Sequence, residues 1–129
     1  MNKLDRESVI GIAALLVHAA NIDEIYSNHE KDLIKEFIKS YLENDDTSQI
    51  LKKAEEIEKS SNQLLNYTNI IKKNSMEVKS DIIEHLWKVL ISDNSVDQYE
   101  ANLMRRICGL IYFSDKECAE IKLKLLNSK

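Results

Sequence analysis

The chain contains no proline and only two glycines, Gly11 and Gly109, in 129 residues. These two residue types supply most of the tight turns of a β-rich fold, so their scarcity argues against a sheet of many short strands. Charged residues make up 31% of the chain and apolar residues 43%, a mixture typical of helices with one buried face. We therefore predict an all-α fold, with one domain spanning residues 1–129.

Helix start signals recur along the chain. Ser27–Glu30, Asp97–Glu100 and Ser114–Glu117 each fit a capping box, in which the first side chain and the Glu bond to each other's backbone amides. Asn74–Glu77 and Asp46–Gln49 are looser versions of the same signal. Apolar residues recur at helical spacing after each signal. The pattern predicts seven helices, near residues 6–20, 28–43, 47–59, 62–73, 75–92, 98–112 and 115–127.

The most apolar segment, residues 9–20, predicts a central helix that is buried on nearly all sides. It is too short to cross a bilayer, and Asp5 and Glu7 precede it where a signal peptide would carry basic residues. The net charge of −4 provides no general attraction to nucleic acid. We therefore expect a cytoplasmic protein with no transmembrane segment and no nucleic-acid partner.

The only two cysteines, Cys108 and Cys118, fall in predicted amphipathic helices and form no CxxC motif. This placement favours reduced, partly buried thiols. A disulfide between them is the alternative, because facing helices could bring the two residues close.

The chain resembles itself when it is shifted by 70 residues, without a gap, from about residue 12 to residue 42. The overlay predicts two repeat units, about 8–43 and 75–113, that pack around a pseudo-two-fold axis. Periodic helices alone would overlay moderately well, so the matching acidic residues between the helices are what support the repeat. Corresponding pairs include Ile12/Ile82, Leu16/Leu86, Asp23/Asp93, Glu30/Glu100 and Phe37/Ile107.

Each repeat unit carries an Asp followed seven residues later by a Glu, between two apolar segments. If the repeat axis brings both loops together, their carboxylates would converge and repel one another unless a cation were bound. Hard divalent cations take several carboxylate ligands. The sequence thus suggests a metal site, with Ca²⁺ as the favoured ion, formed by Asp23, Glu30, Asp93, Asp97 and Glu100.

Helix capping is the alternative interpretation of the same loops. Ser27 and Asp97 are good N-caps, and Glu30 and Glu100 complete their capping boxes without any metal. Capping does not account for Asp23 and Asp93, which follow helices at ends where an acidic side chain opposes the helix dipole. An Asp can also support a tight turn through its backbone amides, so both interpretations remain open.

Two segments resemble the TerB family of tellurite-resistance-associated proteins. "AALLVHAANIDEIYSNHEKDLI" is similar to the family's first helix and acidic loop, and "LWKVLISDNSVDQYEANLMRRICGLIYFSDKE" is similar to its second half. The family's Gly after the first Asp is replaced by Glu24 and Asn94, and its next acidic residue by Ile25 and Ser95. Ser27 also replaces an acidic residue, so a metal site in this chain should depend mainly on the second loop.

The resemblance implies a compact TerB-like bundle and a non-enzymatic, stress-associated module that interacts with a protein partner. It also implies divalent metal binding by the two acidic loops. A purely structural interaction domain with no metal site is the alternative, and a homo-oligomer is a further possibility. A hydrolase or metalloenzyme is disfavoured, because no Ser–His–Asp order, glycine-rich phosphate loop or mutual metal spacing of His18, His29 and His85 is present.

Overall fold

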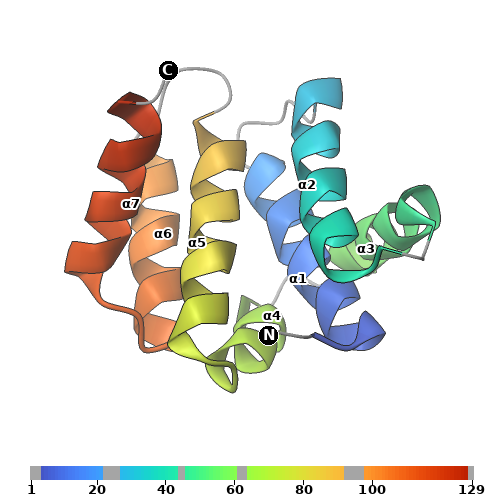
Figure 1. Cartoon of the computed structure of the whole chain (residues 1–129), viewed down its shortest axis with the longest axis horizontal. Helices are drawn as coiled ribbons and strands as arrows, with labels where there is room; N and C mark the ends of the chain where they lie inside the picture. Colours follow the sequence, from blue (N-terminus) through green and yellow to red (C-terminus); the bar gives the residue numbers. More distant parts are fainter. Residues whose placement is uncertain (1–3, 22–26, 44–45, 61–63, 92–97, 128–129) are drawn as a thin grey trace.

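The structure, a computed structural model, describes residues 4–21, 27–43, 46–60, 64–91 and 98–127, with the backbone alone for 64–66 and 98–100. Within these ranges the chain forms seven α-helices and no β-strand, which confirms the predicted all-α class (Figure 1). The helices are α1 (Arg6–Ala20), α2 (Asn28–Tyr41), α3 (Thr47–Ser60), α4 (Leu64–Lys72), α5 (Met76–Leu90), α6 (Gln98–Leu110) and α7 (Asp115–Asn127).

Most predicted helix starts agree with the observed ones, and side-chain caps mark several of them. Asp5 accepts a hydrogen bond from the Ser8 amide at 2.7 Å at the start of α1. The N-cap of α5 is Ser75 and not Asn74, so the Asn74 prediction was wrong by one residue. Asn74 instead donates its side-chain amide to the Ile70 carbonyl at 2.9 Å, which satisfies an acceptor at the end of α4.

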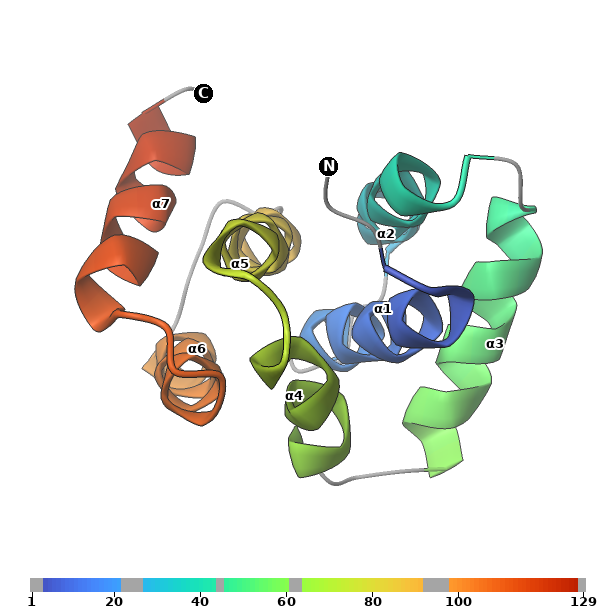
Figure 2. The same cartoon turned by 60° about the horizontal axis from the view of Figure 1, so that its bottom comes forward.

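Helix α1 lies at the centre of the first half of the molecule, where it packs against α2, α3, α4 and α5 (Figure 2). Its buried residues lie on nearly all sides, as the sequence predicted. Helix α4 approaches α1 closely at Gly11, where an added Cβ would come within 2.5 Å of the Ile70 Cδ1 atom. A glycine here therefore permits close contact between the two helices.

The second half is organised around α5, which packs against α1, α2 and α7, while α6 packs against α4 and α7. Trp87 joins α5 to α7 by donating its indole N–H to the Cys118 carbonyl at 3.2 Å. Only 4% of Trp87 is exposed, so it is a core anchor. Buried apolar residues from both halves form one continuous hydrophobic core among the described residues.

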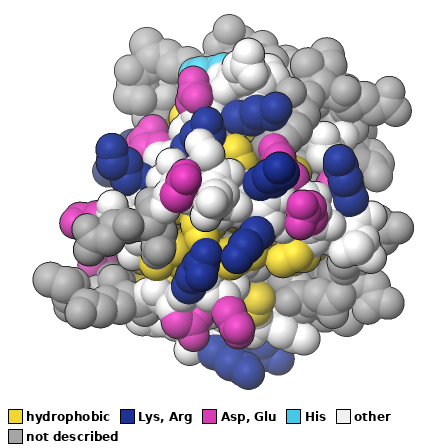
Figure 3. Space-filling model, turned by 90° about the vertical axis from the view of Figure 1, so that its right-hand side faces the viewer, with side chains coloured by type: hydrophobic (Ala, Val, Ile, Leu, Met, Phe, Trp, Pro, Cys, Tyr) yellow, Lys and Arg dark blue, Asp and Glu magenta, His cyan; other side chains and the backbone are white. Residues whose placement is uncertain are grey.

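The surface carries charges of both signs. Figure 3 shows lysine and arginine side chains interleaved with acidic ones on the face formed by the right-hand side of Figure 1, with apolar side chains visible between them. No helix in the described part of the chain combines the length and apolar character needed to cross a membrane.

Candidate functional site

The structure leaves most of the predicted loop site undescribed. Asp23, Asp93 and Asp97 lie outside the described residues, and Glu100 lies in α6 with its side chain also outside them. The helix ends that flank the two acidic segments can be compared, however. The end of α1, the start of α2, the end of α5 and the start of α6 all lie at the upper end of the bundle in Figure 1.

Glu30 is the one predicted ligand whose side chain is described, and it completes a capping box. Its Oε1 atom accepts from the Ser27 amide at 2.8 Å and from the Ser27 hydroxyl at 3.1 Å. The Glu30 amide donates in return to the Ser27 hydroxyl at 3.2 Å. Only 6% of Glu30 is exposed, and its hydrogen bonds in the capping box account for this carboxylate without a cation.

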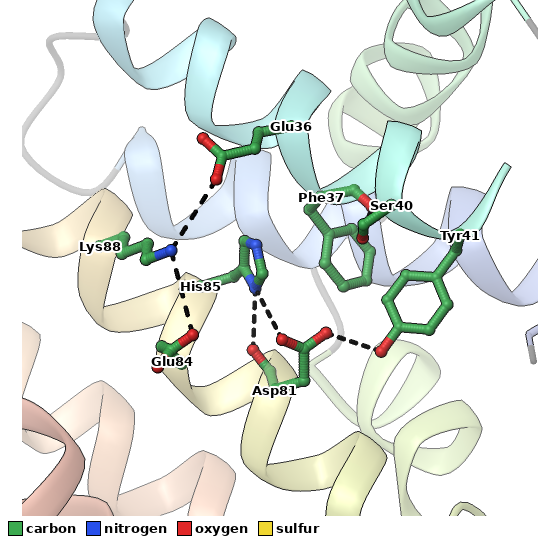
Figure 4. A network of polar contacts seen from close by, with 8 residues as sticks. All are labelled: Glu36, Phe37, Ser40, Tyr41, Asp81, Glu84, His85 and Lys88. Atoms are coloured by element: carbon green, nitrogen blue, oxygen red, sulfur yellow. Dashed lines mark hydrogen bonds and ion pairs between the residues drawn. The ribbon is translucent and has the colours of Figure 1, made fainter. Parts of the chain in front are cut away.

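A second group of chemically active side chains lies where α2 faces α5, and we call it the α2–α5 polar seam. It comprises Tyr41 from α2 with Asp81, Glu84 and His85 from α5 (Figure 4). Asp81, Glu84 and His85 stand at i, i+3 and i+4, a spacing that places them on one face of the helix. One ligand atom from each of these three lies within 4.8 Å of the other two.

Asp81 connects the two helices of the seam. Its Oδ2 atom accepts a hydrogen bond from the Tyr41 hydroxyl at 2.7 Å. The Nδ1 atom of His85 lies 2.9 Å from the Asp81 carbonyl oxygen and 3.5 Å from the Asp81 Oδ1 atom. A proton on Nδ1 would bond to that carbonyl, which would orient the ring and leave Nε2 as the basic nitrogen.

The same contacts change the acidity of Tyr41. Burial, the hydrogen bond to Asp81 and the negative charge of Asp81 together raise the pKa of Tyr41 well above its ordinary value. The phenol therefore remains a neutral hydrogen-bond donor to the Asp81 carboxylate throughout the physiological pH range.

Phe37, a core residue of α2, packs against the rings of the seam. Its ring is fully buried and lies 5.1 Å from the ring centroids of both Tyr41 and His85, with an edge-on geometry toward His85. Such aromatic contacts fix ring positions and stabilise by about 1 kcal/mol beyond the area they bury. The imidazole and the phenol are therefore held in place by the core.

The seam borders an open groove of about 520 Å³, lined by Ser40, Tyr41, Glu77, Ser80, Asp81 and Glu84. Three of these six residues are carboxylates, so the groove is acidic. The Lys88 ammonium lies 3.9 Å from one carboxylate oxygen each of Glu36 and Glu84, which is a weak ion-pair distance. The groove thus suits a cation or a positively charged group on a partner.

Chemically, two carboxylates and an imidazole form a mixed oxygen and nitrogen ligand set, which suits Zn²⁺ or Mn²⁺ better than Ca²⁺. Coordination through Nδ1 would replace the contact of His85 with the Asp81 carbonyl. Three ligands from one helix would also leave the remaining coordination positions to water or to a partner's side chain.

This group was not among the sites expected from the sequence. His85 was considered only for metal spacing with His18 and His29, yet it is buried, with 7% of its surface exposed. The segment Asp81–His85 reads "DIIEH", and its acidic and histidine residues share one helical face. That spacing was the available signal, but many solvated helices carry similar patterns.

The fold and the seam together define a small helical module whose clustered polar groups lie between helices rather than in a deep cleft. Comparison with protein families then gives its identity: the family described as "Tellurite resistance protein TerB" matches residues 9–123, nearly the whole chain. The chain belongs to the TerB family, as its resemblance indicated. Comparison with curated proteins and with solved structures gave no significant match.

Proposed function

We propose that this TerB-family protein is a non-enzymatic cytoplasmic module that binds a divalent cation through its two acidic loops and interacts with a protein partner. The observation that carries the proposal is that the four helix ends flanking residues 22–26 and 92–97 all lie toward the same end of the bundle (Figure 1). Those segments carry Asp23, Asp93 and Asp97 in the sequence. Carboxylates at one end of a bundle repel one another, and a cation relieves that repulsion.

The α2–α5 polar seam is a second place where the same module could bind a cation. Asp81, Glu84 and His85 supply the only group of three or more metal-type ligand atoms found close together among the described residues. The two placements differ in chemistry, because the loops offer oxygen alone and the seam adds an imidazole nitrogen. Ion preference therefore distinguishes them: Ca²⁺ favours the loops and Zn²⁺ favours the seam.

Calorimetric titration of the purified protein with Ca²⁺, Mg²⁺, Mn²⁺ and Zn²⁺ tests the proposal. We expect Asp93→Asn to abolish Ca²⁺ binding and Asp81→Asn to leave it unchanged. Asp32→Asn is a matched control, because it removes one carboxylate from an exposed position on α2.

The opposite pattern, with binding lost in Asp81→Asn and preferred by Zn²⁺, would move the site to the seam and overturn the loop assignment. Absence of heat, together with an unchanged melting temperature at about 1 mM ion, would remove cation binding altogether, since a ligand at that excess over a useful Kd must stabilise the fold.

The second candidate function is a purely structural interaction domain with no metal site. It is favoured by Glu30, whose carboxylate already accepts two hydrogen bonds from Ser27. Under this alternative, a partner captured by the tagged protein would remain bound after a chelator is added. Under the leading proposal the chelator would release it, and sedimentation of the isolated protein would show whether the partner is a second copy of the chain.

A further inference from the structure

The two cysteines of the chain come together between α6 and α7. Both are free thiols, and their side chains lie close enough for each sulfur to influence the acidity of the other. Cys108 is fully buried, and Cys118 is 6% exposed. The contact is a property of the second half of the molecule and does not depend on the cation site proposed above.

The turn between α6 and α7 creates this contact. The Phe113 amide donates to the Cys108 carbonyl at 2.8 Å, and the Tyr112 amide donates to the Gly109 carbonyl at 3.4 Å. Tyr112 has a φ of 59°, and this left-handed residue with its two bonds is a Schellman motif. The motif reverses the chain directly after α6, so that the start of α7 returns past Cys108.

Cys118 lies in the first turns of α7, where its amide donates to the Ser114 carbonyl at 3.0 Å. The Trp87 indole N–H lies 3.3 Å from the Cys118 sulfur and can donate to it. The Lys122 ammonium lies 5.2 Å from the centre of the same indole ring. The Trp87 N–H and the charge of Lys122 both favour a thiolate at Cys118, while burial opposes it.

The two sulfurs consequently differ in acidity. The hydrogen bond from Cys108 lowers the pKa of Cys118; burial opposes this effect, and Trp87 and Lys122 reinforce it against the charge of Asp115. The same hydrogen bond, together with burial, raises the pKa of Cys108. Cys118 is thus the more acidic of the two thiols, and Cys108 is the less acidic one.

We propose that Cys118 and Cys108 form a peroxide-reactive dithiol, in which the Cys118 sulfur attacks a small hydroperoxide and the Cys108 sulfur resolves the product to a disulfide. The pair thereby adds a redox modification site to the module. Its burial selects for a small oxidant such as hydrogen peroxide over a bulky disulfide such as oxidised glutathione.

The chemistry balances in two steps. In the first, the Cys118 thiolate attacks one peroxide oxygen; the S–O bond forms, the O–O bond breaks, and the departing hydroxide takes up a proton as water. In the second, the Cys108 sulfur attacks the Cys118 sulfenic acid; the S–S bond forms, the S–O bond breaks, and hydroxide leaves with the Cys108 proton as a second water. Two thiols lose two electrons in total, and the peroxide gains them.

The wild-type protein supplies the first test. Reduced protein treated with hydrogen peroxide should lose both free thiols and the mass of two hydrogen atoms while remaining a monomer on a non-reducing gel. Trp87 is the only tryptophan in the chain and touches the Cys118 sulfur, so its fluorescence should change in step with the reaction. A product that keeps both thiols, or that carries added oxygen without a disulfide, would overturn the proposal.

Substitutions test the assigned roles of the two sulfurs. Cys108→Ser should accumulate a Cys118 sulfenic acid that dimedone traps. Cys118→Ser should react roughly tenfold more slowly, because Cys108 has no comparable donors to stabilise its thiolate. Trp87→Phe keeps an aromatic ring but removes the N–H, so it should slow the first step and raise the pH at which the peroxide rate is half-maximal.

Equal rates for the two single-cysteine variants would overturn the assignment. Brief dimedone trapping in the wild-type protein, followed by peptide mapping, identifies the first sulfur oxidised even if a variant does not fold. Label on Cys118 supports the proposal, and label on Cys108 contradicts it.

Discussion

Helices α1 and α5 occupy equivalent positions in the two proposed repeat units, yet their surroundings differ. Each has 15 residues and starts from one side-chain N-cap, Asp5 for α1 and Ser75 for α5. Under the 70-residue shift, Ala14 and Leu15 of α1 correspond to Glu84 and His85 of α5. The α1 positions are fully buried and apolar, whereas the α5 positions belong to the polar seam.

The difference follows from what covers each helix. Helices α3 and α4 pack on α1, and α4 comes so close that a Cβ at Gly11 would lie 2.5 Å from the Ile70 Cδ1 atom, which would have to move. The equivalent of Gly11 is Asp81, which instead faces Tyr41 and the open groove. In the first unit these positions pack in the core, and in the second unit the equivalent positions carry polar side chains that can bind a ligand.

Exchanging the side chains at equivalent positions of α1 and α5 should have the largest effect on stability. Ala14→Glu should destabilise the fold by more than about 4 kcal/mol, because it places an unpaired carboxylate in the core. Glu84→Ala should change stability by no more than about 0.5 kcal/mol, because Glu84 is partly exposed and makes only a weak ion pair. Urea unfolding measures both, and comparable losses in the two variants would show that the helices are not differently covered.

The hydrogen bond between Tyr41 and Asp81 should have the next largest effect. Tyr41→Phe leaves the Asp81 carboxylate without its donor and should cost about 1.5 kcal/mol. A double-mutant cycle with Asp81→Ala should give a coupling of about 1 kcal/mol. Tyr112→Phe is the control, because that tyrosine is 69% exposed and should lose almost nothing. A coupling near zero would show that the Tyr41–Asp81 hydrogen bond does not help to hold α2 against α5.

The same bond predicts a pH dependence. Since the pKa of Tyr41 is raised in the folded protein, its contribution to stability is fully present below the ordinary value of 10.0 and is lost as the pH rises above it. Urea midpoints at about pH 9 and about pH 11 should therefore show the advantage of wild type over Tyr41→Phe shrinking at the higher pH. An advantage that stays constant would contradict the buried, Asp81-bonded phenol.

The N-caps of α2 and α5, the helices that border the seam, should also differ in how much they stabilise the fold. Ser27→Ala should cost about 1.5 kcal/mol, because the buried Glu30 carboxylate also loses a partner. Ser75→Ala should cost about 1 kcal/mol, since it removes the cap's hydrogen bond from the Val78 amide at 3.3 Å. Ser80→Ala, in the middle of α5, is the control. Thermal unfolding measures all three, and an equal loss for Ser80→Ala would rule out capping as the cause.

Helix positions were predictable because their signals are local. Ser27, Ser114 and the apolar spacing after them depend on residues three or four apart, and both starts agree with the structure. The Asn74 error is of the same local kind: two adjacent residues can both cap, and only one did. Burial of residues 9–20 was also readable, because hardly any polar residue interrupts the segment.

Contacts between distant segments were not predictable in the same way. Tyr41 meets Asp81 across 40 residues, and this contact depends on how α2 rotates against α5. The thiol pair depends on the left-handed turn at Tyr112, a position where the usual residue would be glycine. The sequence suggested that Cys108 and Cys118 could approach each other, but not which sulfur would receive the Trp87 hydrogen bond.

The smallest predicted effect on stability concerns the C-terminal ends of α2 and α6, the second helices of the two proposed units. Helix α2 ends at Leu42 with a φ of −129°, whereas α6 ends through Tyr112 with a φ of 59°. A non-glycine residue in the left-handed region costs about 1 kcal/mol. The Lys72 ammonium, 5.0 Å from the centre of the Tyr112 ring, offsets part of this cost. Tyr112→Gly should therefore stabilise the protein by about 0.5 kcal/mol, while Leu42→Gly should destabilise it, because glycine gains nothing where φ is negative. Urea midpoints of the two variants decide the matter: a loss of similar size in both would mean that the turn after α6 carries no strain, and that the two units end their second helices at equal cost.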